Sequence, residues 1–236
     1  MLRLVLAGLL VIPAFQATTP QEACDVHDVS VTWGFKESFR SYISGSIAQG
    51  SWAVSGDVGY EIPHFTFTGG EGYVLPDRGA GTVEFDGELL FEGHGGILQT
   101  SLSHPTIVFH GSREATLFLD VVGDTMEEVS VNQAEVPFAV MSWSRDQESV
   151  DSESGHWVIE QAQVTLTDEG SDAFGTYPAG ESMDPLSLEL TVEPGCLSSG
   201  QFAWWVPGGA VALAALGAAV GVAIRRGRKS PEPKHP

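Results

Sequence analysis

The stretch Thr82-Val-Glu-Phe-Asp-Gly-Glu-Leu-Leu-Phe-Glu92 decides the fold class of this chain. Four of its apolar side chains share one parity, namely Val83, Phe85, Leu89 and Phe91. The other parity is mostly acidic. Because successive side chains of a strand point to opposite faces, this alternation predicts half-buried antiparallel strands with one solvated, acidic face.

The same period recurs along the chain. Residues 186–192 alternate strictly and residues 158–166 alternate more weakly, while residues 106–109, 116–122 and 136–141 form shorter apolar stretches. Glycine and aspartate clusters separate these runs, as expected for turns. We therefore expect a mainly β fold, an antiparallel sheet or sandwich-like domain. The chain has no repeat of about 20–50 residues, which excludes solenoids and propellers.

One segment favours a short N-terminal helix. Between Trp33 and Ile43, apolar or aromatic residues stand at positions 35, 39, 42 and 43, a spacing that places them on one helical face. We expect Gly45 to end the helix. The helix carries Lys36 and Arg40, two of only five basic residues between positions 18 and 202.

Both ends of the chain look like targeting segments. Arg3 precedes a short apolar run, which predicts a signal peptide over residues 1–20; an uncut signal anchor is the alternative. Residues 203–224 lack charge and, at ~1.5 Å per residue, can cross a hydrocarbon core of ~30 Å. Within this segment Gly217 and Gly221 either pack against another helix or belong to a plain anchor.

Charge asymmetry gives the orientation. Residues 18–202 hold 30 acidic and five basic side chains, whereas residues 225–236 form a basic tail. By the positive-inside rule the tail is cytoplasmic. We thus expect a single-pass cell-membrane protein with an extracellular domain at 24–196, a linker at 197–202, a transmembrane helix at 203–224 and a cytoplasmic tail at 225–236. The acidity argues against nucleic-acid binding.

The chain has two cysteines, and they flank the expected domain. An exported pair of this kind most simply forms one disulfide, Cys24 to Cys196. The alternative, lipid attachment at Cys24, is disfavoured because Gln21, Glu22 and Ala23 precede it and are too polar as a group.

Catalytic motifs are missing from the sequence. There is no Gly-x-Ser-x-Gly elbow, HExxH, P-loop or EF-hand loop, so we do not expect an enzyme. Asp151, Glu153 and His156 either hold a cation or form a solvated acidic loop. His94 follows the best strand between glycines, which let the backbone approach another group closely, although a turn histidine is the simpler interpretation.

Three segments, taken together and in this order, resemble the HtaA domain, the haem-transport-associated conserved region of actinobacterial surface proteins. The resemblance covers roughly residues 26–192 in a single-domain, membrane-anchored arrangement. The segments are Trp33-Gly-Phe-Lys-Glu-Ser-Phe-Arg-Ser-Tyr42, Phe91-Glu-Gly-His94-Gly-Gly-Ile-Leu98 with Pro105 after it, and Tyr177-Pro-Ala-Gly-Glu-Ser-Met-Asp-Pro185.

The resemblance implies a haem site. Tyr42 matches the axial ligand of ferric haem b, and His94 matches a histidine that hydrogen-bonds that tyrosine. Tyr177 matches a second supporting tyrosine, and Ser38 matches a position near a propionate. A tyrosinate is a hard anionic donor that suits ferric haem. Phe39, with Phe35, could touch the porphyrin, and Lys36 or Arg40 either meets a propionate or is a solvated surface residue.

From this resemblance we expect a cell-surface haem-binding protein that accepts haem from other surface haem-binding proteins. It would relay the haem to the binding protein of a haem ABC importer. The alternative function is a cofactor-free β-rich interaction or adhesion module, since acidic strand faces and glycine-rich loops suit that role equally well.

Overall fold

The computed structural model describes residues 22–111, 113–124 and 130–198. The expected signal peptide, transmembrane helix and basic tail lie outside these residues, as does most of the 197–202 linker. Within the described part of the chain, no helix combines the length and the apolar character that crossing a bilayer requires.

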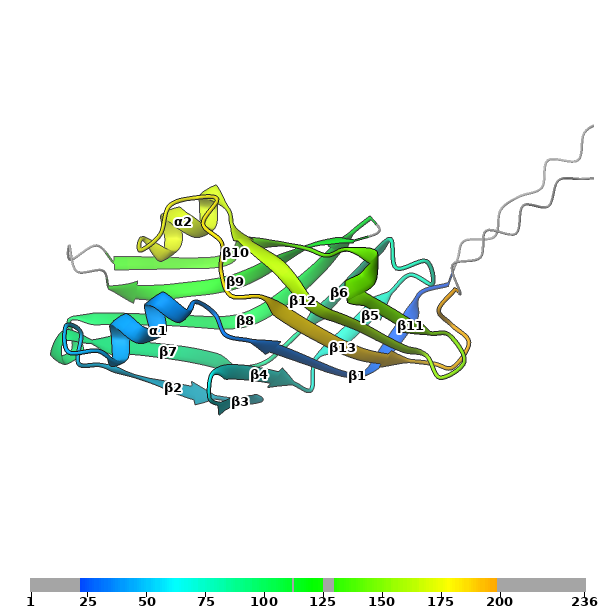
Figure 1. Cartoon of the computed structure of the whole chain (residues 1–236), viewed down its shortest axis with the longest axis horizontal. Coiled ribbons are helices and arrows are strands. Elements are labelled where there is room, and N and C mark those ends of the chain that lie inside the picture. The colour runs from blue at the N-terminus through cyan, green and yellow to red at the C-terminus, as the bar shows by residue number, and fades with distance from the viewer. Residues whose placement is uncertain (1–21, 112, 125–129, 199–236) are drawn as a thin grey trace, which may run out of the picture. The chain divides into compact units, whose positions relative to one another are not determined.

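The described residues are mainly β and antiparallel, as predicted (Figure 1). The strands are β1 (Cys24–Trp33), β2 (Ser51–Ser55), β3 (Val58–Glu61), β4 (His64–Thr68), β5 (Glu71–Val74), β6 (Ala80–Glu84), β7 (Glu88–Gly93), β8 (Leu98–His110), β9 (Glu114–Asp124), β10 (Ser130–Ser142), β11 (Glu148–Asp151), β12 (His156–Leu166) and β13 (Leu186–Val192). The α-helices are α1 (Glu37–Ser44) and α2 (Asp168–Phe174), and single 3₁₀ turns lie at η1 (His94–Gly96) and η2 (Arg145–Gln147).

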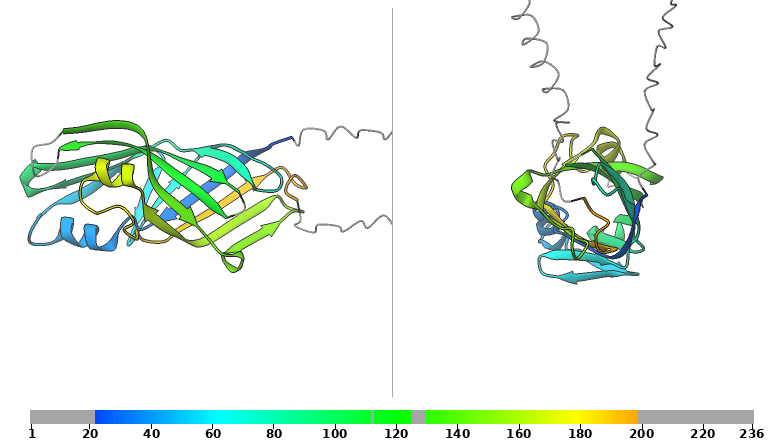
Figure 2. Two further views of the ribbon diagram at one scale, coloured as in Figure 1. Left: turned by 90° about the horizontal axis from the view of Figure 1, so that it is seen from above. Right: turned by 90° about the vertical axis from the view of Figure 1, so that its right-hand side faces the viewer.

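The paired strands form a closed ring. β1 pairs with both β5 and β13, and the path continues from β5 through β6, β8, β9, β10 and β12 back to β13. The end-on view in Figure 2 shows the resulting ring. The expected sandwich-like arrangement is therefore more closed than the sequence indicated. The pairs β3–β4 and β2–β7 extend the sheet from the ring.

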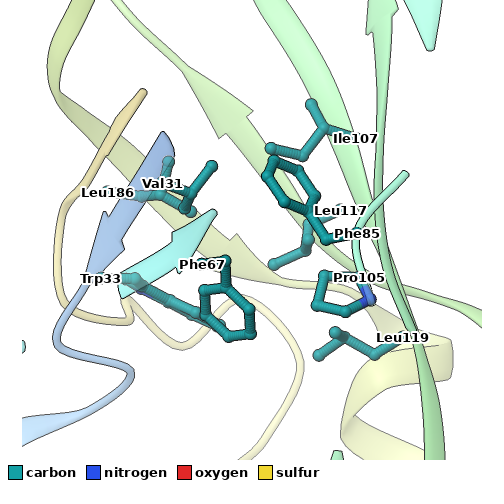
Figure 3. A pocket seen from close by; sticks show the side chains of 9 residues that line it. All are labelled: Val31, Trp33, Phe67, Phe85, Pro105, Ile107, Leu117, Leu119 and Leu186. Atoms are coloured by element: carbon teal, nitrogen blue, oxygen red, sulfur yellow. The ribbon is translucent and has the colours of Figure 1, made fainter. Parts of the chain in front are cut away.

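The apolar face of the stretch 82–92, which indicated the fold class, is buried as predicted. Val83, Phe85, Leu89 and Phe91 are all buried, although Gly87, whose φ is +132°, lies in the break that divides the stretch into β6 and β7. The apolar side chains of β13 also point inward. Figure 3 shows buried side chains, Phe85 and Leu186 among them, around a small cavity inside the ring. The nine residues that line it are apolar or aromatic, so this part of the ring interior is hydrophobic core.

The parity prediction was wrong for the first half of β12. Trp157 and Ile159 are buried there, whereas the sequence favoured Val158 and Glu160. The cause is a shift of register against β13 between Ile159 and Ala162, which exchanges the two faces. After the bulge, the predicted inward residues of the strand are buried.

Helix α1 forms where the periodicity placed a helix and ends before Gly45, as expected. The sequence placed Phe35 on this helix, and that was wrong. Phe35 precedes the helix with φ of +62°, a left-handed conformation that is uncommon for a residue with a side chain.

Helix α2 was not predicted, because Asp168–Phe174 is short, polar and interrupted by Gly170. Thr167 caps it by accepting a hydrogen bond from the Gly170 amide at 2.8 Å. A Cβ at Gly170 would come within 2.1 Å of the Phe138 carbonyl oxygen, so glycine lets the helix lie directly on β10.

The unusual backbone of Phe35 places its ring at the centre of the core. The ring is fully buried and contacts aromatic rings from β1, α1, β7, β10 and α2, which are Trp33, Phe39, Phe91, Phe138 and Phe174 at centroid distances of 5.1–6.1 Å. One side chain thus joins both helices to the sheet.

The predicted disulfide is confirmed. Cys24 and Cys196 are bonded, with Cα atoms 5.9 Å apart, and close a loop whose ends are 172 residues apart. The bond ties the first strand to the segment after β13.

We predict that Phe35→Ala lowers the free energy of unfolding by about 3–5 kcal/mol, because it removes a fully buried ring that five other rings contact. Urea unfolding monitored by tryptophan fluorescence measures this. The control is Val122→Ala on an exposed position of β9, expected to change stability by about 0.5 kcal/mol or less. Equal losses in both variants would contradict the central role of Phe35.

Candidate functional site

The structure brings together four of the residues that the sequence singled out. Ser38 and Tyr42 lie one helical turn apart on α1, His94 begins η1, and Tyr177 follows α2. They form two hydrogen-bonded pairs, Tyr42 with His94 and Ser38 with Tyr177. Segments that are far apart in the sequence thus meet along one face of α1.

The Tyr42–His94 pair is short and partly buried. The Tyr42 hydroxyl oxygen lies 2.6 Å from His94 Nε2. His94 has φ of +55°, and its backbone amide donates to the Ala48 carbonyl at 2.7 Å, which attaches the turn after β7 to the turn after α1. This contact holds His94 in the left-handed region, which is uncommon for a residue with a side chain.

Open space borders the turn that carries His94, since a Cβ added at Gly95 or Gly96 would meet no atom within 4 Å. Two large apolar side chains that are near in sequence to the residues of this contact are exposed: Ile47, next to Ala48, is 73% exposed, and Ile97, at the end of η1, is 58% exposed. The turns that meet at His94 and Ala48 therefore carry apolar side chains that are open to solvent.

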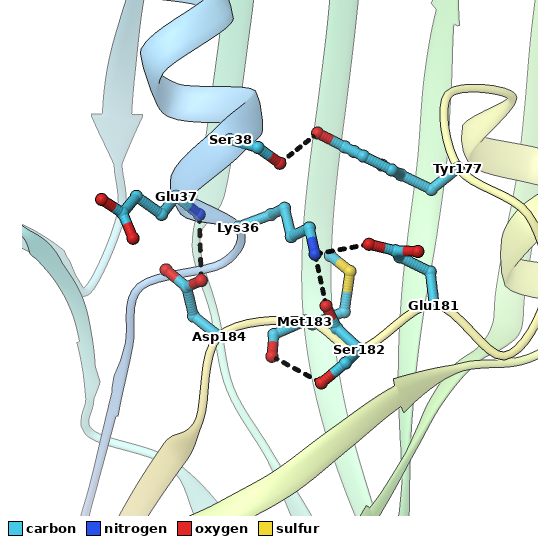
Figure 4. A network of polar contacts seen from close by, with 8 residues as sticks. All are labelled: Lys36, Glu37, Ser38, Tyr177, Glu181, Ser182, Met183 and Asp184. Atoms are coloured by element: carbon cyan, nitrogen blue, oxygen red, sulfur yellow. Dashed lines mark hydrogen bonds and ion pairs between the residues drawn. The ribbon is translucent and has the colours of Figure 1, made fainter.

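The second pair extends the site along the helix. Ser38 Oγ and the Tyr177 hydroxyl are 2.7 Å apart (Figure 4). The Tyr177 ring stacks on Phe174 of α2 with centroids 6.1 Å apart, and its carbonyl accepts a hydrogen bond from Ser171 Oγ at 2.8 Å. Helix α2, which the sequence did not reveal, therefore positions this tyrosine.

Phe39 lies beneath the pairs rather than on the surface. Its side chain is 1% exposed and packs against Phe91 and Phe174 with centroids 5.0 Å apart in both cases. The Tyr42 ring lies 6.4 Å from it, centroid to centroid. Phe39 and Phe35 thus support the tyrosines from the core, and neither is placed to touch a surface-bound ligand directly.

Lys36, which the sequence placed on the helix, is the extended residue just before α1, and both it and Arg40 of α1 are paired with the segment that follows Tyr177. Lys36 Nζ donates to Glu181 Oε1 at 2.6 Å, and Arg40 Nη2 donates to Asp184 Oδ2 at 2.9 Å. The Lys36 ammonium also lies 5.4 Å from the centroid of the Tyr177 ring. The sequence left a propionate or solvent as the partner of these bases, and it did not reveal the acidic partners because they lie about 145 residues away.

Asp184 was missed as a structural residue of the site. Besides Arg40, its carboxylate accepts a hydrogen bond from the Glu37 amide at 2.9 Å, so it caps α1 from a distant part of the chain. Its backbone also accepts a hydrogen bond from Trp33 Nε1 and donates one to the Phe35 carbonyl. The only available signal was its place in the third segment of the resemblance.

The acidic loop weighed as a cation site is a turn. Asp151 Oδ1 accepts hydrogen bonds from the Glu153 and Ser154 amides at 3.0 and 3.3 Å. Hydrogen bonding by the Ser154 side chain and then by these amides lowers the pKa of Asp151. In the described parts of the chain, no group of three or more histidine, cysteine, aspartate or glutamate side chains is arranged to hold a metal ion.

Fold and site together define a class: an antiparallel β domain that presents a tyrosine–histidine pair at the end of a short helix. The chain belongs to the HtaA family, since the family model described as Htaa matches residues 28–189. A comparison with curated proteins gives no match.

Solved structures of Corynebacterium glutamicum proteins are similar to this chain. The C-terminal domain of HtaA is 34% identical, with a TM-score of 0.65 over 72% of this chain and 99% of that domain. The N-terminal domain of HtaA is 29% identical, with a TM-score of 0.59 over 74% and 99%. The haem-binding protein HtaB is 26% identical, with a TM-score of 0.53 over 73% and 98%.

We predict that Asp184→Ala lowers the free energy of unfolding by about 1–3 kcal/mol, because α1 loses its cap and Arg40 its partner. Thermal or urea unfolding measures the change. Asp172→Ala, on an exposed position of α2, is the control and should shift stability by about 0.5 kcal/mol or less. If the two variants are equally stable, Asp184 does not hold α1 in place.

Proposed function

We propose that this chain binds ferric haem b as cargo, with Tyr42 as the axial iron ligand and His94 as the partner of that ligand. The 2.6 Å contact between the Tyr42 hydroxyl and His94 Nε2 is the main support for this proposal. Membership of a family whose solved relatives include a haem-binding protein supports it.

The Tyr42 oxygen and the His94 nitrogen suit the binding of ferric haem. A phenolate oxygen is a hard, anionic donor and suits ferric iron, as in other tyrosine-ligated haem proteins. An imidazole nitrogen at hydrogen-bonding distance accepts the phenol proton or donates to the phenolate, and in both cases it fixes the orientation of the ring.

The surface around the donors matches the amphipathic shape of haem. Ile47 and Ile97, next to Ala48 and at the end of η1, are exposed and would supply apolar contacts to a haem held at Tyr42. One turn back along α1, about 6 Å by helix geometry, the hydroxyl groups of Ser38 and Tyr177 offer polar groups. These hydroxyls would receive the acidic propionates.

We further propose that the protein acts as a relay at the cell surface and is not an enzyme. The disulfide suits an exported domain. Cys196 lies only a few residues before the apolar segment 203–224, so an anchored domain would work close to the membrane. In this position it would accept haem from other surface haem-binding proteins and deliver it to the binding protein of an importer.

We predict that the purified protein, titrated with ferric haem, develops a saturable Soret band characteristic of tyrosinate ligation. Tyr42→Phe should lose most of this band, because it removes the ligand oxygen and keeps the ring. The control is Tyr73→Phe on β5, an exposed tyrosine outside the site, which should titrate like the wild type. A wild-type protein that gives only nonspecific spectra would favour the cofactor-free interaction module instead.

For His94→Ala we predict weaker haem retention, because the Tyr42 oxygen loses the imidazole that lies 2.6 Å away and fixes its orientation. The rate of haem transfer to apomyoglobin measures retention. His110→Ala, at the end of β8, controls for loss of a histidine and should release haem at the wild-type rate. A rate for His94→Ala that coincides with the wild type would exclude the supporting role of His94.

A further inference from the structure

Beside the Ser38–Tyr177 pair stands a single ammonium group whose partner is a carboxylate of the same chain. Lys36 Nζ donates to Glu181 Oε1 at 2.6 Å and to the Ser182 carbonyl (Figure 4). The Lys36 side chain is 16% exposed and that of Glu181 is 33% exposed. Both groups are therefore partly open to solvent, and the ammonium lies 5.4 Å from the centroid of the Tyr177 ring.

Arg40 is less suited to meet the same ligand. It is bound to Asp184, which the Glu37 amide also holds. Arg40 lies two residues from both Ser38 and Tyr42, about 200° around the helix axis from each. It lines a separate depression with Pro63 and His64.

The other described arginines lie elsewhere. Arg78 and Arg113 both bind Glu148 of β11, at the other end of the domain from α1 (Figure 1), and Arg145 is exposed in η2. Lys36 is therefore the cation that the described residues place beside the hydroxyl pair.

We propose, on the basis of the haem binding proposed above, that Lys36 meets a haem propionate and that Glu181 is an internal carboxylate that competes for it. A propionate and a glutamate side chain end in the same group, so they compete for the same ammonium. Two of the three N–H donors of Lys36 are used by Glu181 and Ser182. A propionate at Ser38 and Tyr177 either displaces Glu181 or sits next to its negative charge.

Glu181 has opposite effects on the empty site and on the haem-bound site. In the empty site Glu181 neutralises Lys36 and holds the segment after Tyr177 against α1. When haem is bound, Glu181 opposes the propionate and weakens binding, which suits a protein that must pass its cargo on. Because partly exposed ion pairs contribute little, the competition should change haem affinity about two- to fivefold rather than by orders of magnitude.

The test compares Glu181→Gln, Lys36→Gln and the double variant with the wild type. Ferric haem and its dimethyl ester, in which both propionates are uncharged, are titrated into each protein, and transfer to apomyoglobin gives the dissociation rates. Glu181→Gln should bind haem about two- to fivefold more tightly and release it more slowly. Lys36→Gln should bind more weakly, and Glu181→Gln should improve binding less in the double variant than in the protein that keeps Lys36, because the competition is for the Lys36 ammonium.

With the dimethyl ester, the four proteins should bind alike. The matched control is Glu37→Gln, which removes the same charge from the neighbouring residue, whose carboxylate points away from Lys36 (Figure 4). It should bind haem as the wild type does.

Unchanged or weaker haem binding by Glu181→Gln would overturn the competition, as would an equal gain in Glu37→Gln. If the wild type gives no saturable haem spectrum at all, the proposed function itself fails.

Discussion

The packing of the Phe35 ring is the interaction on which the rest of the site depends. A left-handed backbone at this residue turns the chain from β1 into α1 and sends the ring into the core, where it contacts rings of β7, β10 and both helices. Gly34, just before Phe35, leaves room for the Asp184 carboxylate, because a Cβ there would come within 2.4 Å of Asp184 Oδ2. The aromatic contacts set the height of the helices above the sheet, and the Asp184 carboxylate then sets where α1 begins. Tyr42 and Tyr177 are placed by these two constraints together.

Ion pairs also hold the site together. The domain is strongly acidic, yet its bases near the site are not free, since Lys36 and Arg40 tie the segment 181–184 to α1. The same contacts that hold Tyr177 beside Ser38 also occupy the cations that an acidic cargo needs. Stability of the empty site and affinity for cargo are thus linked through the same few side chains.

The fold class could be predicted from the sequence because period-two alternation reports burial directly, as Val83, Phe85, Leu89 and Phe91 show. Closure of the ring could not, since it depends on pairing between β1, β5 and β13, which no local pattern encodes. The bulge in β12 and the turn at Phe35 were missed for a related reason: both break a period where tertiary packing outweighs local preference. Among the site residues, Tyr42, His94, Ser38 and Tyr177 came from the resemblance. Glu181 and Asp184 acquire meaning only through contacts across about 145 residues.

If the oxygen of Tyr42, supported by His94, holds ferric iron, a crystal structure of the protein with ferric haem bound would show it. We expect a bond between the iron and Tyr42 Oη, with His94 Nε2 still within hydrogen-bonding distance of that oxygen. An iron bound by His94 or by a residue outside this site, or a haem bound with Tyr42 unligated, would contradict it.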